Sequence, residues 1–243
     1  MRLSRSVFSY KEKLKDDKSI EIVLKELADK HKRYGFKKLF HKIRKLGFMW
    51  NHKRVYRVYC SLKLNLKCKP KKRLPVRNKV ELVQPKNINE IWSLDYMSDT
   101  LINGRKFRTA NIIDDCNREA LGIKVSNSLP SKQVIQFLDN VALSKGYPSA
   151  IRLDNGPENI AKTMKEWAKS HNIKLLYIQP GKPAQNGYIE RFNRTYREEV
   201  LNMYLFRNIQ EVQEITDQWM LEYNTERPHY SLGNLTPQEF LRK

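Results

Sequence analysis

The sequence predicts an α/β fold in which helices flank a mixed five-stranded sheet, with a basic helical region in front of it. Three short apolar runs with β-strand character follow one another from residue 91, and the turn signal Asn103-Gly104 joins the first two. Beyond residue 130, segments with helical spacing alternate with two further short apolar runs. Positive charge collects ahead of these runs, because residues 1–80 hold 26 Lys and Arg against 6 Asp and Glu.

The basic region is expected to form three helices. Apolar residues recur at helical spacing in three segments, residues 17–30, 36–46 and 51–62. Asn51 can cap the third of them. A helix, a glycine-containing turn and a basic helix are typical of a helix-turn-helix DNA-binding domain, and a small helical bundle with a basic surface is the alternative. In the first case the exposed cations Lys53, Arg54 and Arg57 would contact DNA.

The charge distribution indicates a polyanionic partner. Residues 67–79 are too charged and too rich in proline to pack, so residues 67–88 are expected to be a linker that lies along a phosphate backbone. Each phosphate that such cations neutralise releases condensed counterions, which favours binding. An anionic membrane surface is a weaker alternative, because the region lacks a broad apolar face and no apolar run is long enough to span a bilayer.

Cysteine usage indicates a reducing compartment. Cys60, Cys68 and Cys116 are scattered and odd in number, which argues against a disulfide framework. No sustained apolar segment follows the basic N-terminus, so no secretory signal is visible. His31 and His41 precede the first two cysteines in the order of a zinc site, but their spacing does not suit one. We therefore expect a cytoplasmic protein without zinc.

The remaining chain is expected to alternate strands and helices. Strands are predicted for residues 91–97, 107–113, 120–125, 150–153 and 175–178. Helices are predicted from Ser131 onward, over residues 158–171, around Glu190 and from about residue 208.

Three acidic residues, far apart in the sequence, fall at defined places in this pattern. Asp95 lies in the first strand, Asp154 directly follows the fourth, and Glu190 lies on a helix that begins after a Gly- and Pro-containing loop. Fifty-eight residues separate the first two acids, and thirty-five separate the second from the third. At 3.6 residues per turn, several polar residues share the side of the helix that carries Glu190: Asn186, Asn193, Arg194 and Arg197.

These residues and their spacing resemble the DDE transposases and retroviral-type integrases, and most closely the second-reading-frame (OrfB) transposase of the insertion-sequence-three family. The resemblance covers roughly residues 30 to 240. It is carried by Arg33-Tyr34-Gly35, Asn51-His52-Lys53-Arg54, Trp92, Asp95, Asp154-Asn155-Gly156-Pro157-Glu158, Gly181-Lys182-Pro183-Ala184-Gln185-Asn186, Glu190-Arg191-Phe192-Asn193, Tyr223-Asn224, Arg227-Pro228-His229, Leu232 and Thr236-Pro237.

The resemblance implies a ribonuclease H-like fold and a catalytic site of three carboxylates. Asp95, Asp154 and Glu190 would be the catalytic residues and would also bind two Mg²⁺ or Mn²⁺ ions, which prefer carboxylate oxygens. The expected domains are a helix-turn-helix-like region, a basic linker, an integrase catalytic core and a C-terminal helical extension, over residues 1–66, 67–88, 89–203 and 204–243.

By the same resemblance, the expected activity is cleavage at the ends of an insertion sequence, which frees a 3′ hydroxyl, followed by strand transfer into target DNA. The partners would be the terminal inverted repeats and target DNA, a homo-oligomer on that DNA, and an upstream-frame (OrfA) protein or fusion. Asn186, Asn193, Arg194 and Arg197 match positions that touch DNA ends. A nucleoid-associated bacterial protein is therefore expected.

Two other functions fit parts of the sequence. A non-catalytic DNA-binding regulator would explain the basic region but not the spaced acids. A tyrosine recombinase would explain His41-Lys42-Ile43-Arg44, although this signature lies outside the predicted catalytic body. Three other acids are not expected to bind metal: Asp114 and Asp115 should be solvated or bonded to the backbone of their turn, and Glu158 should lie near a helix N-terminus.

Overall fold

The computed structural model describes residues 16–66, 84–156, 161–179 and 183–242. Predictions for most of the linker (67–83), Cys68, Glu158 and Gly181-Lys182 lie outside these residues. The chain divides into two compact units, residues 1–71 and 72–243, and each is described by itself. No helix in the described ranges combines the length and the apolar character needed to cross a bilayer.

The first unit contains the three helices that its apolar spacing predicts: α2 (Lys18–Lys30), α3 (Phe36–Lys45) and α4 (His52–Ser61). Ile20, Leu39 and Val55 contribute one residue per helix to a shared core. The Asn51 side chain accepts a hydrogen bond from the Lys53 N–H, which confirms the predicted cap of α4.

The second unit is built on a five-stranded mixed sheet in the order β3-β2-β1-β4-β5. The strands β1, β2 and β3 are antiparallel neighbours, whereas β4 and β5 run parallel to β1. This arrangement confirms the predicted mixed sheet. Their bounds are β1 (Ile91–Thr100), β2 (Lys106–Asp114), β3 (Ala120–Ser126), β4 (Ala150–Leu153) and β5 (Lys174–Tyr177).

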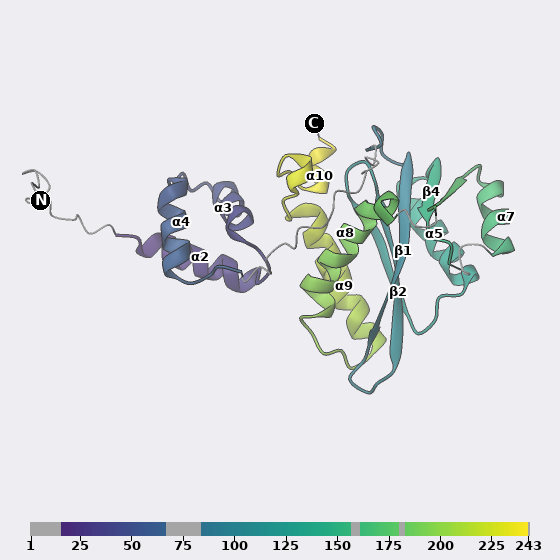
Figure 1. Ribbon diagram of the computed structural model, residues 1–243, viewed down its shortest axis with the longest axis horizontal. Helices are drawn as coiled ribbons and strands as arrows, with labels where there is room; N and C mark the ends of the chain where they lie inside the picture. Colours follow the sequence, from purple (N-terminus) through teal and green to yellow (C-terminus); the bar gives the residue numbers. More distant parts are fainter. Residues whose placement is uncertain (1–15, 67–83, 157–160, 180–182, 243) are drawn as a thin grey trace, which may run out of the picture. The chain divides into compact units, whose positions relative to one another are not determined.

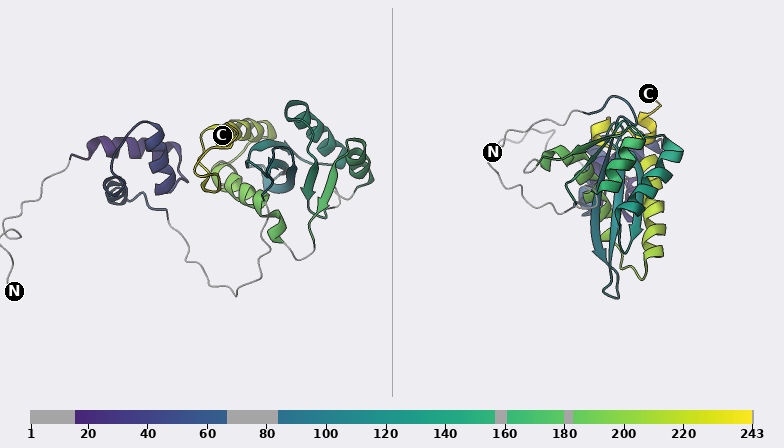
Figure 2. Two further views of the ribbon diagram at one scale, coloured as in Figure 1. Left: turned by 90° about the horizontal axis from the view of Figure 1, so that it is seen from above. Right: turned by 90° about the vertical axis from the view of Figure 1, so that its right-hand side faces the viewer.

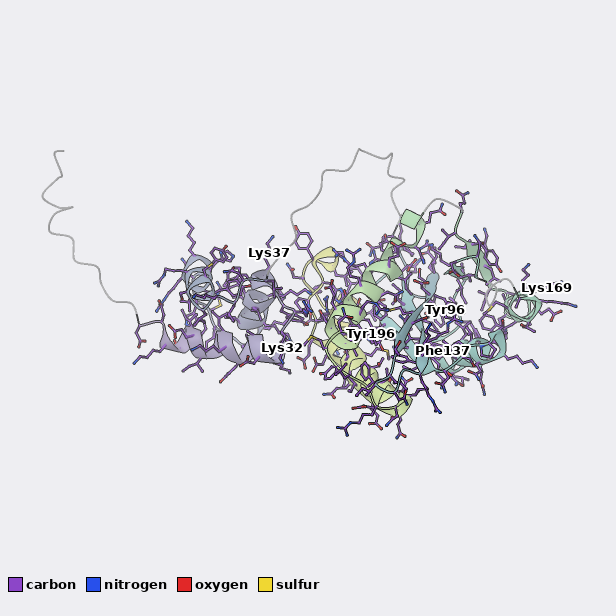
Figure 3. All side chains as sticks on the ribbon, turned by 60° about the horizontal axis from the view of Figure 1, so that its bottom comes forward. Lys32, Lys37, Tyr96, Phe137, Lys169 and Tyr196 are labelled. Atoms are coloured by element: carbon purple, nitrogen blue, oxygen red, sulfur yellow. The ribbon has the colours of Figure 1, made fainter. Side chains whose placement is uncertain are left out.

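Helices cover both faces of the sheet (Figure 1). One face packs against α5 (Ser131–Lys145) and α7 (Lys162–Ser170), and the opposite face against α8 (Gly187–Tyr196) and α9 (Ile209–Thr225). Figure 2 shows the same layers from above. Tyr96 and Phe137 belong to the first of these cores, and Tyr196 belongs to the second (Figure 3).

Side chains alternate between the two cores along each strand, as a pleated strand requires. On β1, Trp92 and Leu94 face the α5 side, whereas Met97 faces the α8 side. Asp95 therefore points toward α8. The alternation therefore directs Asp95 toward the helix that carries Glu190.

The helix that carries Glu190 has irregular ends. A short 3₁₀ turn, η1 (Pro183–Asn186), precedes α8, and a π-helical turn, η2 (Arg197–Leu201), follows it. The backbone N–H of Asn202 bonds to the carbonyl of Arg197 at 2.8 Å, five residues back. The sequence predicted regular α-helical spacing through Arg197. Because a π turn holds more residues than an α-helical turn, side chains beyond it no longer follow the 3.6-residue spacing assumed from the sequence.

The long helix α9 covers the edge of β3. The Asn224 side chain accepts from the N–H of Ala120 and donates to its carbonyl, both at 2.9 Å. The Gln213 side chain likewise accepts from the N–H of Val125 and donates to the carbonyl of Ile123, both at 2.9 Å. These side chains satisfy backbone groups that an edge strand would otherwise leave open. A short 3₁₀ turn η3 (Tyr230–Leu232) and α10 (Pro237–Phe240) complete the unit.

Candidate active site

The sheet places two of the predicted catalytic acids side by side. β1 and β4 are parallel neighbours, and Ser93 pairs with Arg152. Continuing this register by two residues puts Asp154, just past the end of β4, beside Asp95. Because side chains alternate, both carboxylates belong to the face that α8 covers. The long sequence separation of the two acids is thus bridged by one pair of neighbouring strands.

The third acid comes from α8. Its apolar residues Ile189, Phe192 and Tyr196 are buried against the sheet, as the helical spacing predicts. Glu190 is exposed in the first turn of the helix. The start of α8 is held by Tyr188, whose ring centroid lies 3.4 Å from the guanidinium carbon of Arg118, in the turn before β3.

The three acids interact electrostatically. The pKa of Asp95 is raised to about 6, first because burial disfavours its charged form. The negative charges of Asp154 and Glu190 raise this pKa further, whereas hydrogen bonds from the Tyr96 N–H and the Asn193 side chain lower it. A carboxylate under such repulsion is stabilised by a nearby cation.

Two side-chain amides form a chain of hydrogen bonds that ends at Asp95. Asn193 donates from Nδ2 to Oδ2 of Asp95 at 2.8 Å. Its Oδ1 accepts a hydrogen bond of 2.7 Å from Nδ2 of Asn111, on β2. Asn193 was expected to contact DNA, but the structure buries it and joins it to Asp95. Asn111 carries no signal in the sequence, because only the β1–β2 pairing brings it to the site.

The donor chemistry fits a hard divalent ion such as Mg²⁺ or Mn²⁺, because all three acids offer carboxylate oxygens. In the described residues, however, no three His, Cys, Asp or Glu side chains are gathered closely enough to hold a metal ion. Asp154 accepts a hydrogen bond from the Gly156 N–H at 3.0 Å, as in a turn. The acids therefore lie within electrostatic reach of one another but not in ligand positions.

The other predicted residues of this helix lie in different surroundings. Arg194 is exposed, on the same helix as Glu190. Arg197 donates to the carbonyl of Ser98 at 2.9 Å and pairs with Asp99 at 3.3 Å, so β1 holds its guanidinium. Asn186 is buried, and its Oδ1 has no hydrogen-bond partner in the described parts of the chain. DNA contact by these residues stays a prediction.

The predicted DNA-contacting cations of α4 also differ among themselves. Lys53 is exposed. Arg54 and Arg57 both form ion pairs with Asp17, at the start of α2, and lower the pKa of that carboxyl. Asp17 occupies the N-cap position of α2, but its side chain makes no capping hydrogen bond. The two arginines therefore join α4 to α2 within the unit.

The two turn acids differ in their surroundings: Asp114 bonds to backbone groups, as the sequence predicts, whereas Asp115 is buried and bonds to side chains, which the sequence did not predict. Asp114 accepts from the backbone N–H groups of Asn89 and Cys116, both at 2.7 Å. Asp115 is fully buried, accepts from the Ser93 hydroxyl at 2.7 Å and pairs with Arg152. Burial raises the pKa of both acids. This network joins the turn before β3 to β1 and β4.

A second buried ion pair joins the C-terminal segment to the helix of the site. Arg227 binds Glu199 through Nη2 at 2.7 Å and Nε at 3.2 Å, and the indole N–H of Trp219 donates to the same carboxylate at 3.0 Å. Glu199 lies in η2. Trp219 and Tyr223 pack against Phe192, so both aromatic rings belong to the core beneath α9.

Comparisons with known proteins agree with this geometry. A model of the integrase core domain matches residues 85–183, a second integrase core domain model matches residues 171–237, and a model of an HTH-like domain matches residues 15–73. The two core models together cover all five strands and α8, which carries Glu190.

Two curated relatives match nearly the whole chain. The Insertion element IS407 uncharacterized 31.7 kDa protein of Burkholderia multivorans (strain ATCC 17616 / 249) is 36% identical, over 99% of this chain and 87% of its own length. Transposase InsD for insertion element IS2 of Escherichia coli is 23% identical, over 94% of this chain and 80% of its own length.

A solved structure has a similar fold. It is the simian T-cell lymphotropic virus intasome in complex with PP2A regulatory subunit B56 gamma. The likeness has a TM-score of 0.56 and 17% identity, over 91% of this chain and 74% of that chain. The ribonuclease H-like fold is thus confirmed, and with it the family resemblance: the chain belongs to the DDE transposase and integrase superfamily and is a transposase of the insertion-element type.

Proposed function

We propose that Asp95, Asp154 and Glu190 form the catalytic site of this transposase and hold two Mg²⁺ or Mn²⁺ ions. The reaction would be hydrolysis at the element's end, which frees a 3′ hydroxyl, followed by attack of that hydroxyl on a target phosphodiester. The placement of the acids supports the proposal most strongly, because Asp95 lies in β1, Asp154 directly follows its parallel neighbour β4, and Glu190 lies on the helix over the same face of the sheet.

When bound, two divalent ions would activate the attacking oxygen and stabilise the leaving oxygen. The chain's own residues would do the rest. Asp95 would contribute a carboxylate whose orientation is fixed from one side by Asn193. Glu190 is exposed on α8, where DNA can approach. Arg194, one turn further along, would bind a phosphate with its guanidinium.

The partners follow from the same proposal. The basic HTH-like unit would bind the terminal inverted repeats, with Lys53 free to meet the backbone phosphates, while the catalytic site would bind the cleaved end and target DNA. A homo-oligomer on DNA, an upstream-frame partner or fusion, and association with the nucleoid are also part of this proposal. So is the division into a core over residues 89–203 and an extension over residues 204–243.

The experiment that tests the catalytic assignment is the substitution Glu190→Gln in the full chain. Cleavage of end DNA with Mg²⁺ or Mn²⁺ should fall by about 10⁴-fold or more, the scale on which the loss of one member of a catalytic triad acts. DNA affinity without metal should stay the same. Glu198→Gln is the matched control, because Glu198 is also an exposed acid of this helical segment but belongs to the π turn.

A regulator without catalytic activity predicts a different result. Wild type and Glu190→Gln would then bind DNA equally well, and neither would nick it with any divalent ion. A chelator-resistant nick that survives Glu190→Gln would also contradict the proposal, because it would require a nucleophile on the protein in place of metal-activated water.

A further inference from the structure

Asn111 is a buried polar residue at the margin of the core under α8 and α9. It lies directly opposite Asp95 in the antiparallel β1–β2 register and is completely buried. On the same face of β2, Phe107 and Ile113 belong to that core, and Thr109 between Phe107 and Asn111 is also buried. A buried amide in such a place requires hydrogen-bond partners, because burying it without them costs free energy.

Only one end of the Asn111 amide has a partner. Nδ2 donates to Oδ1 of Asn193, whereas Oδ1 of Asn111 has no hydrogen-bond partner within the described residues. A side chain that leaves a buried oxygen unsatisfied is a poor choice for stability alone. The Nδ2 group of Asn111 is the end that forms a hydrogen bond, and its partner is Asn193.

The direction of each hydrogen bond follows from the chemistry of Asp95. An ionised carboxylate can only accept, so Asn193 must present its NH₂ group to Asp95 and its oxygen to the other side. If the Asn193 amide turned over, its oxygen would face the carboxylate and repel it. A donor from Asn111 opposes that rotation, because it binds the oxygen only in the observed orientation.

We propose that Asn111 is a positioning residue that locks the side-chain amide of Asn193 in the orientation that donates to Asp95. The consequence for function rests on the proposed catalytic role of Asp95. With its Oδ2 held by Asn193, the carboxylate keeps one orientation before the ions arrive. Residues that orient metal ligands in this way commonly change metal affinity or activity by about 10–100-fold when they are removed.

Thr109 provides a matched control from the same strand. It lies two residues before Asn111, on the same face of β2, and is also fully buried. Its hydroxyl has no hydrogen-bond partner in the part of the chain that the structure describes. Thr109→Val therefore changes a buried polar group of the same surface without touching the chain of amides that leads to Asp95.

The first test needs neither metal nor activity. In the ¹⁵N-labelled full chain, the Nδ2 protons of Asn193, assigned by their loss in Asn193→Ser, should exchange slowly with water. Asn111→Leu and the smaller Asn111→Val should accelerate this exchange at least about tenfold, whereas Thr109→Val should leave it unchanged. Fast exchange in the wild type, or equal exchange rates in a folded Asn111 variant and the wild type, would overturn the proposal.

The second test links the lock to the metal. The Mn²⁺ concentration needed for half-saturation should rise about 10–100-fold in Asn111→Leu. It is measured in two ways, from the thermal stabilisation of the chain by Mn²⁺ and from the cleavage of end DNA. DNA affinity without metal should stay the same, and Thr109→Val should behave as wild type. An equal loss in Thr109→Val would overturn the proposal, because it would reveal a general packing defect.

Failure of the proposed function would look different from failure of the lock. A wild-type chain that never cleaves DNA contradicts the catalytic assignment, whereas the exchange rates of Asn193 still decide whether Asn111 orients its amide. If the wild type cleaves DNA and Asn111→Leu cleaves it equally well at every Mn²⁺ concentration, only the role of Asn111 is contradicted.

Discussion

At the scale of single residues, Asp95 is held in a balance that a cation would shift. Burial and two neighbouring negative charges favour its protonated form, and two hydrogen bonds favour its charged form. The effects that favour the protonated form outweigh the hydrogen bonds, because the pKa is about 6 instead of the ordinary value of 3.8. Ion binding requires the charged carboxylate, so metal affinity and proton affinity compete at this residue.

The raised pKa of Asp95 predicts how pH affects the metal-free chain. The folded state binds the Asp95 proton more tightly than the unfolded state, so this residue stabilises the fold below about pH 4. That contribution should disappear as the pH rises through about 6. Chemical denaturation at a series of pH values should show a larger decline between pH 4 and 6 for the wild type than for Asp95→Asn.

The comparison with Asp95→Asn removes the contribution of the other buried acids, such as Asp115, which are present in both chains. Parallel stability curves for the two chains would contradict the assigned pKa. Mn²⁺ should oppose the decline in the wild type alone, and its apparent affinity should increase as the pH rises through about 6.

Single residues also show which parts of the site the sequence can predict. The places of the three acids in the fold were predictable, because a short strand, a strand followed by an Asn-Gly turn and a helix after a Gly- and Pro-containing loop mark them. Their catalytic role was implied only by the family resemblance and stays a proposal. Asn111 was not predictable, because its contact with the site depends on the pairing of β1 with β2. The Asp115–Arg152 pair depends likewise on contacts between distant segments.

At the scale of elements, the helix of the site is held from several directions. Arg118 covers Tyr188 at its start, the sheet packs against its apolar face, and Glu199 binds Arg227 just after its end. The π turn η2 contains both Arg197 and Glu199, whose side chains have different partners. Arg197 reaches back to β1, whereas Glu199 faces the C-terminal segment.

The pair between Glu199 and Arg227 should be costly to break from one side. Both side chains are largely buried, so Arg227→Met leaves a carboxylate without its cation and should lower the free energy of unfolding by about 3–5 kcal/mol. Glu199→Leu should cost a similar amount. The double variant should cost clearly less than the sum of both single variants, because it leaves no unpaired charge.

Urea unfolding of the four chains measures this coupling. Additive effects of the two substitutions would show that the ion pair contributes nothing beyond the packing of each side chain. Glu214, exposed on α9, supplies a control substitution, Glu214→Gln, which should change stability little.

Element positions were largely predictable, because the strands and helices follow strong apolar spacing and marked turns. The predicted strand over residues 150–153 has the observed bounds, and the first strand continues three residues beyond its predicted end at Met97. The spacing could not predict the π turn after Tyr196. It reflects tertiary contacts of Arg197 and Glu199, which a local periodicity does not contain.

At the scale of the whole molecule, charge is divided sharply along the chain. Residues 1–80 carry a net charge of +20, and the rest of the chain is nearly neutral, with 21 Lys and Arg against 20 Asp and Glu. Sequence-independent affinity for DNA should therefore come mainly from the basic region, and it should weaken steeply with added salt.

Two exposed lysines test this division in the full chain. Lys53→Gln on α4 should weaken DNA binding and reduce the slope of log affinity against log salt by about 1, as the loss of one phosphate contact does. Lys169→Gln on α7 (Figure 3) should leave both quantities unchanged. Titrations of labelled end DNA by fluorescence anisotropy at several salt concentrations measure them, and equal slopes for both variants would contradict a basic region that dominates binding.

The helix that covers β3 has a consequence for assembly. Gln213 and Asn224 occupy backbone groups of β3 that a strand from another molecule would need, so two copies cannot merge their sheets at this margin to make one continuous ten-stranded surface. Any multimer that gathers around DNA must be joined through other surfaces. Exchanging Gln213 and Asn224 for apolar side chains should leave the backbone groups of the β3 edge open to pairing with another chain. The purified protein should then precipitate or form fibrils on warming.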